Sequence, residues 1–97
     1  MRFEWDEAKR RANIRKHGFD FADVVEMFSR PMLVAPDTRD DYGENRWRGL
    51  GWIGGRLTQV VFAEKEPDVV RIISLRKATP RERENFEKAI YDGLEEN

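Results

Sequence analysis

The sequence of 97 residues predicts one α+β domain, residues 1–97, in which helices pack on a small antiparallel sheet of three to five strands. Three observations support this fold class. Two capped helical segments follow the first few residues, alternating segments joined by short turns fill the middle, and a third capped helix comes last. Because short turns join only antiparallel neighbours, the strands are expected to form a meander.

Capping residues indicate two helices in the N-terminal part. Asp6 is a typical N-cap for a helix that runs to about His17, where Gly18 supplies the stop. Asp20 can cap a second helix, which Pro31 ends. The residues expected to form its buried stripe are Phe21, Val24, Val25 and Phe28.

The last helix has the strongest start signal. Thr79 and Glu82 form a capping box around Pro80, which suits the first helical position. The residues expected to face the core are Phe86, Ala89, Ile90 and Leu94.

Alternation of polar and apolar residues predicts the strands. They are expected at residues 2–5, 32–35, 46–53, 56–64 and 69–76. Gly54 and Gly55 form a two-residue hairpin turn, and a polar, acidic loop covers residues 36–45. Gly49 and Gly51, inside a strand, indicate a bulge or a close approach of another segment.

Composition narrows the function classes. The absence of cysteine excludes disulfides, thiolate zinc sites and a cysteine nucleophile. The charged N-terminus and the lack of a long apolar run predict a cytoplasmic protein that does not contact membranes. No cofactor is expected in so small a core, and no spacing of acids completes a metal site around His17, the only histidine.

Charge is unevenly distributed although the net charge is only −1. Residues 46–56 contain three Arg and no acid, and residues 71–83 contain five Lys or Arg and one acid. Acidic stretches at 37–44 and 84–97 flank them. Basic stretches of this kind can bind phosphates locally, and ordinary mixing of surface charge is the alternative interpretation.

The strand at 69–76 places an arginine among apolar residues. Strict alternation puts Val69, Arg71, Ile73 and Leu75 on one face and Val70, Ile72, Ser74 and Arg76 on the other. A guanidinium cannot stay buried here without a partner. Arg71 therefore extends its charged end to solvent, faces a functional groove, or forms a salt bridge with Glu44 or Glu64 as candidates.

Cations gather where this strand ends and the last helix begins. They are Arg76, Lys77, Arg81 and Arg83. Cations oppose the dipole at a helix N-terminus, so they favour binding of an anion there. A solvated basic edge is the alternative.

A second basic strand combines arginine with tryptophan. Arg46, Arg48 and Trp52 share one face, and Trp47 lies on the other. Arginine beside an aromatic ring suits RNA, because guanidinium binds phosphate and rings stack on unpaired bases. Core packing is the favoured alternative for each tryptophan, Trp5 included.

His17 can exchange protons near neutral pH, or it can simply stabilise a helix C-terminus.

Three blocks of the sequence resemble the BrnT toxins of type II toxin–antitoxin pairs. They are FEWDEAKRRANIRKHGFDFADVVEMF at the start, E-N-R followed by G in the middle, and RIISLRKATPRERENF, and together they extend over about residues 3–86. Two features depart from the pattern: Leu75 stands where a small residue is expected, and the acidic tail is longer.

The resemblance implies a RelE-like ribonuclease fold, RNA cleavage that blocks translation, and an antitoxin of the BrnA kind as partner. DNA would be bound only indirectly, through the complex with the antitoxin. Direct binding of DNA by this chain has less support, because its second helix is acidic.

The resulting hypothesis is a metal-independent endoribonuclease. The proposed catalytic residues are Arg71 and Arg76 for phosphate and transition-state charge, Arg46 in support, and His17 or Glu44 as proton carrier. The proposed RNA-binding residues are Arg48, Lys77, Arg81, Arg83 and Trp52. The alternative hypothesis is a non-catalytic module that acts only by binding a partner protein. Inhibition is expected from a separate antitoxin or, less favoured, from the acidic tail folding back.

Overall fold

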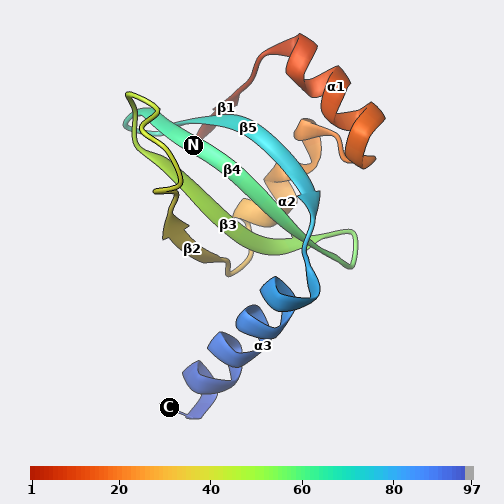
Figure 1. Cartoon of the computed structure of the whole chain (residues 1–97), viewed down its shortest axis with the longest axis vertical. Coiled ribbons are helices and arrows are strands. Elements are labelled where there is room, and N and C mark those ends of the chain that lie inside the picture. The colour runs from red at the N-terminus through yellow and green to blue at the C-terminus, as the bar shows by residue number, and fades with distance from the viewer. Residues whose placement is uncertain (96–97) are drawn as a thin grey trace.

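The computed structural model describes residues 1–95 as three helices and a five-stranded sheet in the order β1-β5-β4-β3-β2 (Figure 1). The strands are β1 (Arg2–Glu4), β2 (Leu33–Pro36), β3 (Arg46–Ile53), β4 (Arg56–Glu66) and β5 (Val69–Lys77). The helical elements are α1 (Glu7–His17), the 3₁₀ turn η1 (Phe21–Asp23), α2 (Val24–Phe28) and α3 (Pro80–Glu95).

The sheet is mixed rather than purely antiparallel. Strands β2 to β5 form the expected antiparallel meander, with β4 in the centre. Strand β1 pairs with β5 in parallel, which corrects the prediction. Only strands joined by a short turn must be antiparallel, and two helical segments separate β1 from the other strands.

The capping residues of α1 and the glycines of the hairpin turn adopt the conformations that the sequence indicates. The Asp6 side chain accepts a hydrogen bond from Lys9 N at 3.1 Å, and Gly18 ends α1 with φ 75°. At the hairpin, Gly54 and Gly55 have φ angles of 55° and 80°, a backbone conformation that glycine adopts without strain.

Asn13 fixes α1 to the sheet edge. This helix is polar all round, and Asn13 is its buried residue. The Asn13 side chain donates to Phe19 O at 2.9 Å and accepts from Leu75 N at 3.1 Å. Arg10 adds a two-point contact with Asp20. The helix is therefore held by hydrogen bonds more than by an apolar face.

The main core lies between one sheet face and the segment η1–α2. Phe21, Val24 and Met27 are fully buried there, whereas Val25 is 57 % exposed, so its predicted place in the stripe is wrong. The three residues per turn of η1 bring Phe21 and Val24 onto one side, and Met27, three residues further along α2, lies on that side too. The two strand glycines allow a close approach: a Cβ on Gly51 would lie 2.9 Å from Met32 Cγ.

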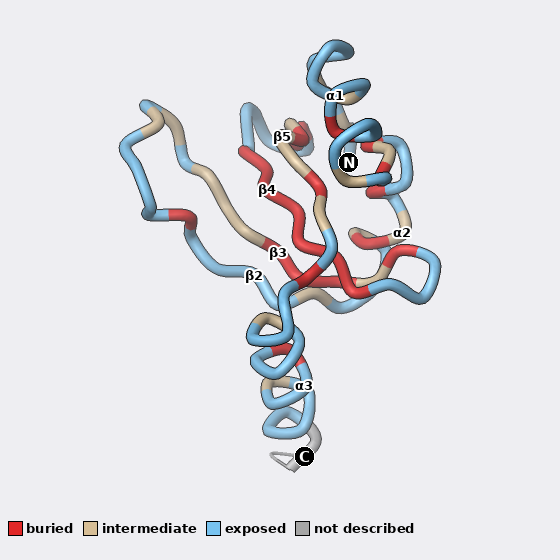
Figure 2. The backbone as a smooth tube through the Cα atoms, turned by 45° about the vertical axis from the view of Figure 1, so that its right-hand side comes forward, coloured by how far each residue is buried: buried red, intermediate tan, exposed pale blue. Residues whose placement is uncertain are grey.

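Helix α3 leaves the sheet soon after it starts. Glu82 N donates to Thr79 Oγ1 and Thr79 N donates to Glu82 Oε1, which completes the capping box. Phe86 is buried against Leu50 and Leu57, but Ile90 is 46 % exposed, which corrects its predicted burial. Most of the helix projects away from the strands (Figure 2). The predicted burial of Leu94 falls outside the described side chains.

Candidate functional site

A bulge in β5 brings two predicted site residues onto one face of the sheet. Arg71 pairs with Ala63, and Arg76 pairs with Gln59. Between these two pairs the register shifts, because Phe62 lies opposite Ile72 whereas Val61 lies opposite Ser74. The extra residue is Ile73, which has no partner in β4. A bulge inserts one residue and so reverses the alternation beyond it. The prediction that Arg71 and Arg76 lie on opposite faces is therefore wrong.

The same face carries the two arginines of β3. Arg46 pairs with Ala63 and Arg48 pairs with Val61, so both lie on the face of Arg71 and Arg76. The core residues of η1 and α2 pack on the opposite face. On this face the start of α3 covers only the end near Leu50, through Phe86. We call this surface the arginine face and define it by Arg46, Arg48, Arg71 and Arg76.

Arg46 and Arg71 flank a small residue on the arginine face. Both pair with Ala63 from opposite sides, so two interstrand spacings, roughly 10 Å, separate their Cα atoms. Two long side chains with only alanine between them can approach one anion from both sides.

Arg71 has no protein partner. Within residues 1–95 its side chain makes no hydrogen bond and no ion pair within 4.0 Å, so the predicted salt bridge with Glu44 or Glu64 is wrong. Glu44 instead contacts Arg46 at 3.2 Å and Lys65 at 3.4 Å. Arg71 is half-buried, and its guanidinium therefore keeps its full hydrogen-bonding capacity for a ligand.

Glu44 acts on Arg46 together with Tyr42. Partial burial of Glu44 opposes ionisation, but hydrogen bonds from Arg46 and Lys65 outweigh it and lower the pKa of the carboxyl group. The Arg46 guanidinium lies over the Tyr42 ring, 4.0 Å from its centroid. These contacts orient Arg46 along the arginine face.

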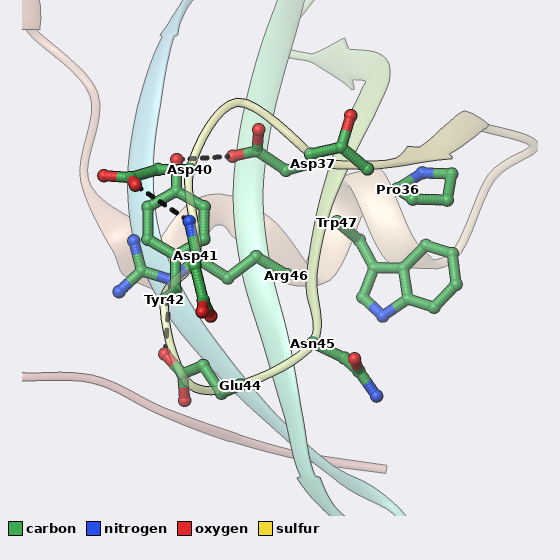
Figure 3. A pocket seen from close by; sticks show the side chains of 10 residues that line it. Pro36, Asp37, Asp40, Asp41, Tyr42, Glu44, Asn45, Arg46 and Trp47 are labelled. Atoms are coloured by element: carbon green, nitrogen blue, oxygen red, sulfur yellow. Dashed lines mark hydrogen bonds and ion pairs between the residues drawn. The ribbon is translucent and has the colours of Figure 1, made fainter.

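The acidic loop is organised by a buried carboxylate. Arg39 contacts both Asp37 oxygens, at 2.7 and 2.8 Å, and the Asp37 side chain is only 1 % exposed. These hydrogen bonds lower the pKa of Asp37 to about 2, against the effect of burial, and Arg48 adds to the shift. The loop encloses a hollow of about 700 Å³, whose lining side chains include Asp37, Tyr42 and Arg46 (Figure 3).

Arg76 is already paired. Its two terminal nitrogens donate to Glu82 at 2.8 and 2.9 Å, and Gln59 Nε2 donates to the same carboxylate at 2.7 Å. The hydrogen bonds from Arg76 lower the pKa of Glu82. Arg76 is thus fixed in place, with its charge largely balanced.

The other predicted site residues are distributed around the arginine face. His17 borders a hollow of about 220 Å³ with Ile73 and Ser74, at the edge of β5, and shares no described contact with the arginines. Arg83 lies 5.8 Å from the Trp52 ring centroid. The Trp52 ring packs edge-on against Phe86, and Lys77 and Arg81 are exposed.

The tryptophans pack mainly as core residues. Trp5 and Trp47 contact the main cluster, and Trp52 contacts the smaller cluster under α3. This confirms the packing interpretation and leaves Trp52 as a half-buried ring beside Arg83.

Sequence reasoning missed three polar residues of the site. Asp37 was part of an acidic loop without assigned contacts, and Glu82 was interpreted only as a helix cap. Gln59 sits among apolar residues in a buried strand, and a polar residue in such a position is a signal that could have identified it.

Residues 1–95 contain neither a metal-binding cluster nor a membrane-spanning helix. No three His, Asp or Glu side chains gather as a metal ion would need. No helix in this range is both long and apolar enough to span a membrane.

These features define a small α+β protein with four arginines on one face of a mixed sheet. The chain belongs to the family of ribonuclease toxins, BrnT, of type II toxin–antitoxin systems, whose family model matches residues 5–82. It is similar to the ribonuclease toxin BrnT of Brucella abortus, known from a crystal structure, with 36 % identity and a TM-score of 0.68. That similarity covers 81 % of this chain and 97 % of the other. No protein with curated annotation matches significantly.

Family membership confirms the resemblance seen in the sequence and sets the general activity. Members are ribonuclease toxins, so RNA is the target and an antitoxin is the partner that membership implies. Most of α3 lies beyond the matched residues 5–82.

Proposed function

We propose that this toxin is an endoribonuclease that cleaves RNA through the 2′-hydroxyl group, needs no metal ion, and thereby blocks translation. The observation that carries the proposal is the unpaired guanidinium of Arg71, opposite Arg46 across Ala63. RNA supplies its own nucleophile, so the protein has only to orient the backbone, move protons and stabilise negative charge.

In the proposed reaction the 2′-oxygen attacks the adjacent phosphorus, and the bond from phosphorus to the 5′-oxygen breaks. The products are a 2′,3′-cyclic phosphate and a 5′-hydroxyl. Arg71 and Arg46 bind the non-bridging phosphate oxygens, on which charge increases in the transition state. Arg76, which Glu82 holds in place, binds a neighbouring phosphate.

We assign the two proposed proton carriers different roles. Glu44 has a lowered pKa, so its carboxylate is a weak base at neutral pH, and its contact with Arg46 suits a positioning role. His17 is the better candidate for proton exchange, because imidazole can both accept and donate a proton near neutral pH. It would act from the edge of the arginine face, beside Ser74.

The test is cleavage of RNA by purified toxin in the presence of EDTA. We expect cleavage to continue and to leave 2′,3′-cyclic ends. Arg71→Ala should lower the rate about 100-fold or more, because it removes charge stabilisation at the reacting phosphate. The matched control is Arg15→Ala, an exposed arginine on α1. Loss of cleavage on chelation would contradict the metal-independent mechanism.

Induction of the toxin alone separates catalysis from mere partner binding. We expect arrested translation and growth, and relief of both by Arg71→Ala while the protein stays folded. If wild-type protein accumulates with intact RNA and normal growth, a module that only binds a partner becomes the better account.

The proposed partner is an antitoxin of the BrnA kind that covers the arginine face. An acidic or apolar segment would balance Arg71 and Arg46 and exclude RNA, and DNA would be contacted only through the complex. Opposite charges should also speed association. The test is competition between RNA and antitoxin at increasing salt, where we expect affinity for the antitoxin to fall. A nearly constant affinity would show that apolar burial dominates the contact.

The remaining proposed RNA contacts surround this face. Arg48, Lys77, Arg81, Arg83 and Trp52 would bind the strand on either side of the cleaved phosphate. The exposed cations among them should contribute mainly to salt-dependent affinity, as phosphate contacts do.

A further inference from the structure

Arg48 holds an unsatisfied hydrogen-bond donor. Among the side chains of the described residues, its Nε is the one buried nitrogen or oxygen atom without a hydrogen-bond partner. The charge of Arg48 helps to lower the pKa of Asp37, but no hydrogen bond joins the two residues. A buried donor left unpaired destabilises the folded state. An unpaired buried donor in a folded protein needs an explanation. A ligand that supplies the missing acceptor provides that explanation.

Arg48 borders a small hollow between β2, β3 and the start of α3. The hollow has a volume of about 160 Å³. Its apolar walls are Leu33, Ala35 and Leu50, and its polar groups besides Arg48 are Gln59, Glu82 and Asn85.

The hydrogen bonds around Glu82 determine what this hollow can offer. Glu82 Oε1 accepts from Arg76 and Thr79, and Oε2 accepts from Arg76 and Gln59, which uses the four acceptor sites of a carboxylate. Glu82 therefore has no capacity left for a ligand. Because Gln59 donates through Nε2, its Oε1 remains as an acceptor in a fixed orientation.

The polar groups of the hollow thus form an ordered set. Arg48 offers a donor, Gln59 offers an acceptor, and the exposed amide of Asn85 can serve as either. Neighbouring donors and acceptors between apolar walls match the edge of a nucleobase. They fit a phosphate less well, because a phosphate would face the Glu82 carboxylate and have no use for the acceptor of Gln59.

We propose that this hollow binds one unpaired base of the RNA and sets the sequence preference of cleavage. This inference rests on the proposed function, because it assigns a base to the strand whose phosphates bind the arginine face. Binding requires the Arg48 guanidinium to turn its buried Nε–H toward the hollow, and Leu33 and Leu50 then contact the ring. Glu82 acts as a positioning residue that holds Gln59 and Arg76.

The first experiment does not depend on cleavage. The Nε–H signal of Arg48 is followed by ¹⁵N NMR and assigned by its loss in Arg48→Lys. The probes are RNA trinucleotides with 2′-O-methyl groups, which prevent cleavage, and only the middle base varies. All probes carry the same phosphates, so we expect one or two bases to shift the signal clearly more than the others. Equal shifts with all four bases would show a phosphate contact and overturn the proposal, and so would no shift.

The second experiment maps cleavage sites on a long RNA. Arg48→Lys keeps the charge but removes the Nε donor, so we expect the ratio between preferred and other sites to fall roughly five-fold or more. Asn85→Ala changes an exposed helix residue and should alter the same ratio, whereas Glu84→Ala, next to it, should not. An unchanged ratio in both Arg48→Lys and Asn85→Ala would overturn the proposal. If wild-type protein cleaves no RNA, the proposed function fails, while the NMR experiment still tests the hollow.

Discussion

At the scale of single residues, Asn13 joins three parts of the fold. Its amide connects α1 to Phe19 O, in the segment after the helix, and to Leu75 N, on β5. Leu75 follows the bulge at Ile73, so the Asn13 contact also secures the stretch of β5 that carries Arg76. One buried side chain therefore links the polar helix to the strand on which the arginine face depends.

Asn13→Ala should destabilise the protein strongly. The change leaves Phe19 O and Leu75 N without a side-chain partner, which costs about 1–3 kcal/mol for each group. We expect a loss of about 2–4 kcal/mol in the free energy of unfolding, measured with urea. Asn45→Ala, which truncates an exposed asparagine, is the control and should change it by less than about 0.5 kcal/mol. A loss equally small in Asn13→Ala would show that packing alone holds α1.

Asp37 makes stability depend on acid pH. Its pKa is about 2 in the folded protein, against an ordinary value of 3.8. A lowered pKa means that the stabilisation is complete above the ordinary value and disappears as pH falls through the folded value. The shift corresponds to about 2 kcal/mol, of which about 1 kcal/mol should be lost by pH 3.

The test is urea unfolding of Asp37→Asn and wild type at pH 5, 4 and 3. The variant should be less stable at pH 5, but its free energy of unfolding should fall less with acid, by about 1 kcal/mol at pH 3. Asp23→Asn, at an exposed carboxylate, should retain the wild-type slope. Equal slopes for Asp37→Asn and wild type would contradict the role assigned to the Arg39 contact.

The candidate site could be predicted from sequence only in part. Residue types and spacing indicated Arg46, Arg71 and Arg76, but alternation placed Arg71 and Arg76 on opposite faces. A one-residue bulge at Ile73 reversed that assignment, and the apolar residues around Ile73 do not indicate a bulge. The pairing of Arg76 with Glu82 was equally hidden, because the Thr79 capping box already explained Glu82.

At the scale of elements, β3 owes its packing to two glycines. A Cβ on Gly51 would meet Met32 Cγ at 2.9 Å and Met27 Cε at 3.4 Å. A Cβ on Gly49 would lie 3.1 Å from Val60 Cγ1. The missing side chains let the segment around Met27 and Met32 lie directly on the strand.

Gly51→Ala should therefore lower stability, because Met32 or the strand must move. We expect a loss of about 1–3 kcal/mol in the free energy of unfolding. Gly93→Ala is the matched control: a Cβ there meets nothing within 4 Å, and alanine favours helix. That control should leave stability unchanged or raise it by up to about 1 kcal/mol. If Gly51→Ala left the free energy of unfolding unchanged, the close approach of Met32 would contribute nothing to stability.

The elements themselves could largely be predicted from sequence, because their ends depend on local chemistry. Asp6, Gly18 and Thr79 act through contacts within a few residues, and these form as expected. The errors arise where long-range packing decides. The parallel pairing of β1 and the exposure of Ile90 both depend on which surface lies opposite, and no local pattern encodes that.

At the scale of the whole molecule, the arginine face and the acidic helix diverge. Helix α3 starts at the end of β5, contacts the sheet through Phe86, and then extends away from the strands (Figures 1 and 2). The exposed residues Ile90 and Tyr91 lie on this projecting part. The described residues of this part therefore lie away from the strands, and inhibition by the tail would require the helix to bend or melt.

Truncation after Tyr91 should accordingly leave the rate of RNA cleavage within about two-fold of wild type, because α3 keeps its capping box and its contact through Phe86. The measurement is cleavage of one RNA by both proteins at equal concentration and low salt, where electrostatic inhibition would be strongest. The full chain with Asp92→Asn, Glu95→Gln and Glu96→Gln together separates the effect of charge from that of length, because these are the three acids that truncation removes. Added antitoxin should inhibit the truncated and full-length toxins alike, because the proposed contact is the arginine face. A several-fold rise in cleavage on truncation, without antitoxin present, would instead establish that the tail restrains the enzyme in cis.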